Sequence, residues 1–232
     1  MKKLLLIASI AVASNAFAVV AYDNTNATTV NLLNNGGAAT AGGGTIVVAD
    51  LLTIDPAFVG WTMSVLTWGV GNTDTTATTA RMRVRFWADN AGTPGTLLGG
   101  STFNATSIPA GANAYNADFT SAAIALPSKI WVGFLFDSLA TSTPALVAKL
   151  NKLGLLYHSG PPAVGSSADS VWASSAAGSN FVNSPAGTVI GSPFGGNPIA
   201  NAYFKVQAVP EPASMVAVAL GLAAVARRRR SK

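Results

Sequence analysis

Short hydrophobic runs separated by clusters of Gly, Pro, Asn and Ser make up most of the chain between residues 19 and 208. The clearest run is Arg81–Trp87, in which polar and apolar residues alternate. A strand with this period places Met82, Val84 and Phe86 on a core face and the three arginines on a solvated face. Four further runs predict strands at 45–54, 60–70, 129–137 and 202–207. Short strands at this spacing indicate an all-β ectodomain, a β-sandwich or jelly roll.

Three stretches of the ectodomain are less regular. Residues 144–157 fit either a helix or a pair of strands that turns at Asn151. Residues 34–44 are rich in Gly and Ala, as a linker would be. Residues 159–198, dominated by Ser, Gly, Pro, Ala and Asn, are predicted to form long loops at one end of the sandwich or a separate arm.

The N-terminus has the three parts of a secretion signal in order. Lys2 and Lys3 are followed by an apolar segment, residues 4–13, that is too short to span a bilayer. Small residues at Ala16 and Ala18 then form a cleavage site. We therefore expect residues 1–18 to be a signal peptide and the mature chain to begin at Val19.

The C-terminus, residues 209–232, also has three parts. A motif of Val209, Pro210, Glu211 and Pro212 precedes an apolar run at 213–226 and a basic end at 227–232. The two prolines keep the motif extended and stop a following helix from growing backwards. As a helix the run would cover about 21 Å at the usual rise per residue, against roughly 30 Å of hydrocarbon. It is predicted to be a single, marginal transmembrane helix with its basic end in the cytoplasm.

This tail resembles the PEP-CTERM sorting signal of Gram-negative bacteria, which has the same three parts in the same order. The resemblance implies processing by an exosortase, a membrane cysteine protease, after passage through the secretion translocon. It also implies a final location at the cell surface or in an extracellular matrix linked to exopolysaccharide. By motif, the sorting residues are Val209 to Pro212, and the retention signal consists of Arg227, Arg228, Arg229 and Arg230. The segment from Trp87 to Leu97 resembles, more loosely, a turn found in ectodomains of such proteins.

Charge and composition exclude several other classes of protein. The formal net charge is +5, but 7 of the 14 basic residues lie in the two terminal segments. Residues 19–208 hold the other 7 basic residues and 8 acidic ones, so the ectodomain is about neutral (7 − 8 = −1) and nucleic-acid binding loses its basis. The chain has no cysteine, which excludes disulfides and thiolate chemistry.

The ectodomain shows no pattern typical of catalysis, and we expect neither enzymatic activity nor a cofactor. His158, the only histidine, is expected in a loop, and the aspartates are expected at turns. Asp89 and Asn90 are candidate calcium ligands in a tight turn, where Asn90 and Gly92 are residues that tolerate positive φ, but a structural role in that turn is the preferred interpretation.

Two interpretations of the molecular role follow. The first is a structural or adhesive protein associated with exopolysaccharide. The alternative is a non-catalytic carbohydrate-binding module that uses exposed aromatic rings. Trp87 and Trp172 are its candidate glycan contacts, because Trp87 interrupts the arginine face and Trp172 lies in a polar stretch.

Overall fold

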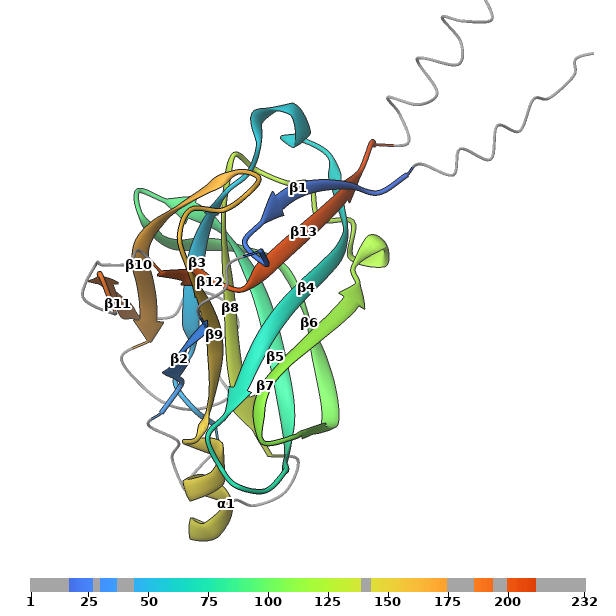
Figure 1. The fold of residues 1–232 in the computed structure, drawn as a ribbon. Helices are drawn as coiled ribbons and strands as arrows, with labels where there is room; N and C mark the ends of the chain where they lie inside the picture. Colours follow the sequence, from blue (N-terminus) through green and yellow to red (C-terminus); the bar gives the residue numbers. More distant parts are fainter. Residues whose placement is uncertain are drawn as a thin grey trace, which may run out of the picture.

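The computed structural model describes residues 17–26, 30–36, 44–138, 143–174, 186–193 and 200–211. These residues form two antiparallel sheets packed as a sandwich (Figure 1), which confirms the all-β prediction. The predicted signal peptide up to residue 16 and the tail from residue 212 lie outside the described residues. Within the described part of the chain, no helix has the length and hydropathy needed to cross a membrane.

The first sheet contains both ends of the described chain. Its main order is β1-β13-β4-β9-β12, with β7 paired to β4 and β2 paired to β9. The strands are β1 (Val19–Asp23), β2 (Val30–Asn34), β4 (Thr62–Asn72), β7 (Gly111–Asp118), β9 (Leu153–Ser159), β12 (Ala200–Ala202) and β13 (Phe204–Val209).

The second sheet has the order β11-β10-β3-β8-β5-β6. Its strands are β3 (Val48–Thr53), β5 (Thr78–Asn90), β6 (Thr93–Ile108), β8 (Lys129–Asp137), β10 (Ser166–Ser174) and β11 (Gly187–Gly191). In the described part of the chain, three short helices connect strands: η1 (Pro56–Phe58), η2 (Thr120–Ala122) and α1 (Pro144–Leu150).

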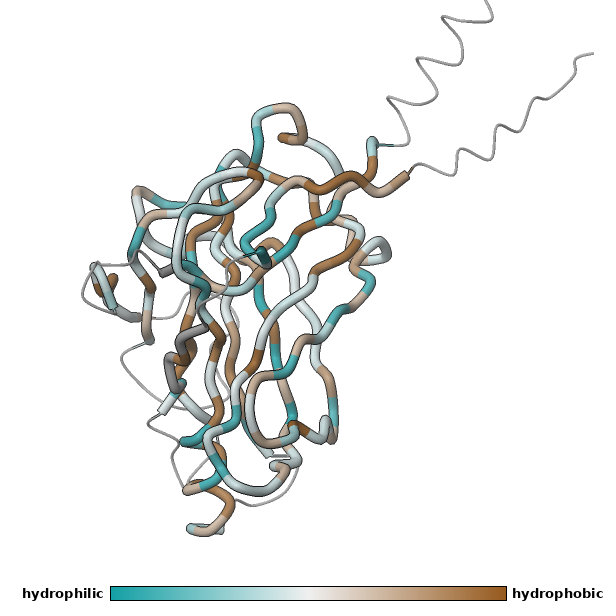
Figure 2. Tube along the Cα trace, in the orientation of Figure 1, coloured by the Kyte–Doolittle hydropathy of each residue, from teal (hydrophilic) through white to brown (hydrophobic). Residues whose placement is uncertain are grey.

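The main core lies between the two sheets and consists of hydrophobic residues of their strands, whose positions along the chain are brown in Figure 2. Met82, Val84 and Phe86 are fully buried there, as the alternation in this strand predicts. Trp68 of β4 stacks at a tilt on Phe134 of β8, with 5.5 Å between ring centroids, and joins the two sheets.

A second, smaller core lies on the opposite face of the six-stranded sheet. Trp87, Trp131 and Trp172 alternate with residues of the main core on β5, β8 and β10, so their rings lie on the outer face. All three are buried together with Val47, Ala49 and Leu135. The six-stranded sheet therefore carries an apolar cluster on each face.

The segment 144–157 is neither of the two structures expected from its sequence. It forms α1, whose first turn is capped by the Thr143 hydroxyl accepting from the Leu146 N–H at 3.3 Å, and then part of β9. Thr and Pro at a helix start favour this short helix, while β9 owes its form to pairing with β2 and β4.

The region 159–198 also differs from the predicted loops or arm. Its described residues include β10, which pairs along β3 in the sheet, and the edge strand β11. Most of the linker expected at 34–44 lies outside the described residues.

Candidate functional site

The sorting motif begins where the last strand of the sandwich ends. Along β13 the side chains alternate, with Phe204, Val206 and Ala208 buried in the core. Val209 still pairs with Thr62 of β4. Pro210 has no N–H to continue the ladder, and Glu211 is exposed. The motif thus leaves the folded domain without a spacer, and its acidic residue is accessible.

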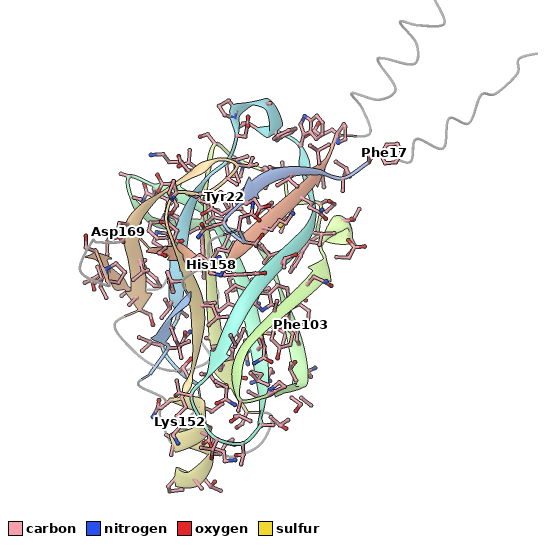
Figure 3. The ribbon with its side chains drawn as sticks, in the orientation of Figure 1. Phe17, Tyr22, Phe103, Lys152, His158 and Asp169 are labelled. Carbon is pink, nitrogen blue, oxygen red and sulfur yellow. The ribbon has the colours of Figure 1, made fainter. Side chains whose placement is uncertain are left out.

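The N-terminal strand lies directly beside this exit. β1 runs antiparallel to β13, with Val19 opposite Ala208. Val19 is the first residue after the predicted signal cleavage site, and Phe17 extends beyond the sheet (Figure 3). Both predicted processing points therefore lie at the same end of the sandwich (Figure 1).

The segment between β3 and β4 completes this end of the domain. The Asp55 N–H donates to the carbonyl of Ala21 in β1 at 3.1 Å, which ties η1 to the N-terminal strand. Phe58 and Trp61 form an edge-to-face pair with 5.1 Å between centroids. Both rings are partly buried, and Val59 between them is exposed.

The two tryptophans predicted to contact glycans are not exposed, which corrects that expectation. Trp87 and Trp172 are 0% and 1% exposed, respectively. Gly133 lies against the Trp87 ring, and Gly187 of β11 lies against the Trp172 indole. A sugar needs an open ring face to stack on, and in this structure both faces are occupied by protein.

The candidate calcium ligands belong to the β5–β6 hairpin. The Asp89 carboxylate accepts from the Gly92 N–H at 3.1 Å and from the Trp131 indole N–H at 2.9 Å. Positive φ occurs at Gly92 and at Ala91, whereas Asn90, which could tolerate it, is the last residue of β5. Two such residues form the tight turn that suits a twisted hairpin. Within the described residues, no three His, Asp or Glu side chains are grouped to hold a metal ion.

The arginine face of β5 is not solvated as expected. Asp137 at the end of β8 is fully buried and lies between two guanidinium groups. Arg81 donates to one carboxylate oxygen through Nη2 at 2.8 Å, and Arg83 contacts the same oxygen at 2.9 Å. The hydrogen bond with Asp137 raises the pKa of Arg81. Arg85 donates to the carbonyls of Val84 and Ser101.

Asp50 is the most unusual polar residue of the structure, and sequence reasoning missed it. Its carboxyl is fully buried between the sheets and accepts from the Ala202 N–H of β12 at 2.8 Å. The Ser167 hydroxyl lies 3.2 Å from the other oxygen. Burial raises its pKa from 3.8 to about 7 against the opposing effect of these hydrogen bonds. A single acid inside the apolar run at 46–52 is the sequence pattern that could have revealed it.

His158 also differs from its prediction, since it lies in β9 rather than in a loop. In that strand (Figure 3) it pairs with Asn201 of β12. Its ring meets the Tyr203 ring edge-on, with 4.6 Å between ring centroids. Burial lowers the pKa of the imidazole. Asp50 and His158 thus occupy β3 and β9, which corrects the expectation that these polar groups lie at turns and loops.

The structure and the C-terminal segment define the class of protein: an all-β sandwich whose last strand leads directly into a sorting signal. Residues 208–230 match the PEP-CTERM protein-sorting motif, so the chain carries this motif. The motif implies export and a location at the cell surface or outside the cell. No curated protein matches this chain in sequence.

Two solved structures share a distant likeness. One contains the cysteine protease and lectin-like domains of Cwp84, a surface layer associated protein of Clostridium difficile, with 13% identity and a TM-score of 0.42. The other is a variant of the clostridial cysteine protease Cwp84 after propeptide cleavage, with 12% identity and a TM-score of 0.43. The matches cover 72% and 80% of this chain, respectively, and 32% and 38% of those chains. The chain thus spans about a third of their length.

Proposed function

We propose that this chain is a secreted, exosortase-sorted protein that serves as a non-catalytic structural or adhesive component of an exopolysaccharide-containing surface layer. The observation that carries the proposal is the sorting motif at the exit of β13, with Glu211 exposed to a processing enzyme. The exosortase acts on the tail, and the sandwich is the part that remains outside the cell.

The surface of the sandwich is compatible with a hydrated matrix. Strands β6 and β7, which lie in different sheets, expose small uncharged polar side chains, including Thr102, Asn104, Ser107 and Asn116. Such groups can exchange hydrogen bonds with water and with neutral sugars without a charge requirement. The stability needed outside the cell comes from two apolar cores rather than from disulfides.

The structure weakens the alternative that this chain binds carbohydrate through the two tryptophans predicted from sequence. Trp87 and Trp172, the two residues that would have contacted the glycan, are part of the second core.

The proposal is tested by the C-terminus of the protein in a host with and without an active exosortase. Intact-mass measurement should show loss of the apolar and basic segments when the enzyme is present, and the full tail when it is absent. Glu211→Ala combined with Pro210→Ala and Pro212→Ala should leave the full tail in both hosts. Ser192→Ala, on the exposed residue after β11, is a matched control that should be processed normally.

The matrix role is tested separately by the distribution of the processed protein. We expect it to sediment with the extracellular polysaccharide and to be released when the polysaccharide is absent. A processed protein that is free in the medium of a polysaccharide-producing host would contradict the matrix role while leaving sorting intact.

A further inference from the structure

We propose that the end of the sandwich from which both chain termini leave is a membrane-docking surface that rests on the lipid interface while the sorting tail is inserted. This inference depends on the proposed function, because it requires the tail to enter a membrane during export. We call this end the exit surface and define it by Val19, Phe58, Val59 and Trp61.

The exit surface contains two exposed valines, and Phe58 and Trp61 beside Val59 are partly buried against the main core. Val59 is 42% exposed and Val19 is 38% exposed. Among the described residues, the other large hydrophobic side chains classed as exposed are Phe17, in the predicted signal peptide, and Val189 and Ile190 of β11. Half of those in the predicted mature chain therefore lie beside the sorting motif.

Hydrogen bonds and strand pairing hold these residues together. Asp55 is tied to β1 through the Ala21 carbonyl. Trp61 immediately precedes Thr62, the partner of Val209 in the sheet. Trp61 also shares backbone bonds with Leu126 and Phe58. The hydrophobic colouring of β1 at this end is visible in Figure 2. The surface is consequently a fixed feature of the fold, not one side chain on a free loop.

The short connection between β13 and the apolar run holds the exit surface close to the membrane. Pro210, Glu211 and Pro212 are the only residues between the end of β13 and the apolar run. Three extended residues reach about 10 Å at most. The run itself, as a helix of about 21 Å, is shorter than the roughly 30 Å hydrocarbon layer, so insertion draws the motif toward the lipid. The exit surface then lies within the headgroup region.

The composition of the surface favours the apolar part of the interface over anionic headgroups. Tryptophan and tyrosine are enriched at this depth of a bilayer, because their rings are amphipathic. Within residues 17–22, 55–62 and 206–211, the charged side chains are Asp55 and Glu211, both acidic. The segment 125–129, which is hydrogen-bonded to Ile54 and Trp61, adds the exposed Lys129, so these charges sum to −1. A few apolar side chains bind lipid weakly on their own, but the inserted tail raises their effective concentration. We therefore expect docking that is insensitive to anionic lipid and to salt.

The five tryptophans provide a direct readout, because Trp68, Trp87, Trp131 and Trp172 are at most 1% exposed and Trp61 alone is partly exposed. The exported protein with its tail intact, isolated from a host without exosortase, is reconstituted into phosphatidylcholine vesicles brominated near the top of the acyl chains. Bromine quenches an indole only on close approach. We expect the bromine to quench only the part of the tryptophan fluorescence that comes from Trp61, which is at most about a fifth of the total. The Trp61→Phe variant should show no quenching.

A pair of matched substitutions locates the contact. Val59→Asp should abolish most of the quenching, whereas Val189→Asp, equally exposed but on β11, should leave it unchanged. Flotation of the vesicles verifies that the tail is inserted in every variant. Circular dichroism verifies the fold.

The outcomes separate this inference from the proposed function. An inserted, folded protein without Trp61 quenching overturns membrane docking, even when its C-terminus is processed normally in cells. Quenching that appears only with co-reconstituted exosortase also overturns it, since the surface would then fit a protein partner. Quenching without processing in an exosortase-positive host would instead refute the sorting function.

Discussion

The buried carboxyl of Asp50 makes a specific prediction about how stability depends on pH. Burial raises the pKa of Asp50 from its ordinary value of 3.8 to about 7 in the folded protein. A raised pKa means that the folded state binds the proton more tightly than the unfolded state. The stabilisation is therefore complete below pH 3.8 and is lost as the pH rises through 7.

The contacts of Asp50 explain how a protonated acid is accommodated. The Ser167 hydroxyl lies 2.8 Å from the Leu51 carbonyl and 3.2 Å from the Asp50 carboxyl. If the single hydroxyl hydrogen goes to the closer carbonyl, the serine oxygen is available to accept a proton from the carboxyl. The other carboxyl oxygen accepts the Ala202 N–H in either protonation state.

The magnitude follows from the two pKa values. The full contribution is about 4 kcal/mol, and the part lost between pH 5 and pH 8 is about 3 kcal/mol. Asp50→Asn removes the titration and retains the shape, since its amide can donate to Ser167 as the protonated acid would. The difference in unfolding free energy, variant minus wild type, should increase by that amount from pH 5 to pH 8.

Urea unfolding followed by tryptophan fluorescence measures this difference. The unfolding free energy of wild type is compared with that of Asp50→Asn because His158, which is present in both, changes the stability with pH in the opposite direction. Burial lowers its pKa, so its contribution is present above the ordinary value of 6.5 and is lost as the pH falls. Tyr22 and Tyr157, whose pKa values burial raises well above 10.0, titrate outside this window. If the wild-type and Asp50→Asn curves stay parallel between pH 5 and pH 8, the reasoning about Asp50 is wrong.

Three further predictions concern the outer face of the six-stranded sheet. Asp137→Ala leaves two partly buried guanidinium groups without their carboxylate and should lower the unfolding free energy by about 3 kcal/mol in urea titrations. The control Lys205→Ala removes a more exposed ion pair and should lower it by less than about 1 kcal/mol. Equal losses in the two variants would contradict the role of burial. Gly133→Ala would place a methyl carbon 2.7 Å from the Trp87 ring and should cost about 1–3 kcal/mol; Gly191→Ala meets no atom within 4 Å and should melt with the wild type. Trp172→Ala should destabilise the protein by about 3–5 kcal/mol in urea; a folded variant of unchanged stability that has lost glycan binding would instead restore the carbohydrate-binding interpretation.

The sequence by itself determined the features that depend on neighbouring residues. The alternation along 81–87 assigned Met82, Val84 and Phe86 to the core because successive strand residues point to opposite faces. The sorting motif could be identified because its three parts are contiguous. The short helix α1 and the turn at residues 90–93 were only partly predicted, since pairing with distant strands decided where the helix ended and which turn residues took positive φ.

Only the tertiary structure decided which outward-facing side chains are exposed. Trp87 and Trp172 come from strands separated in the sheet by β8 and β3, and both are covered once the sheet assembles. Arg81 meets Asp137 across 56 positions of sequence, and Asp50 meets Ala202 across 152. The period of a strand shows which face a residue occupies. What covers that face depends on the register and order of strands that are distant in the chain, and this is why the buried acids and the exit surface emerged from the fold rather than from the sequence.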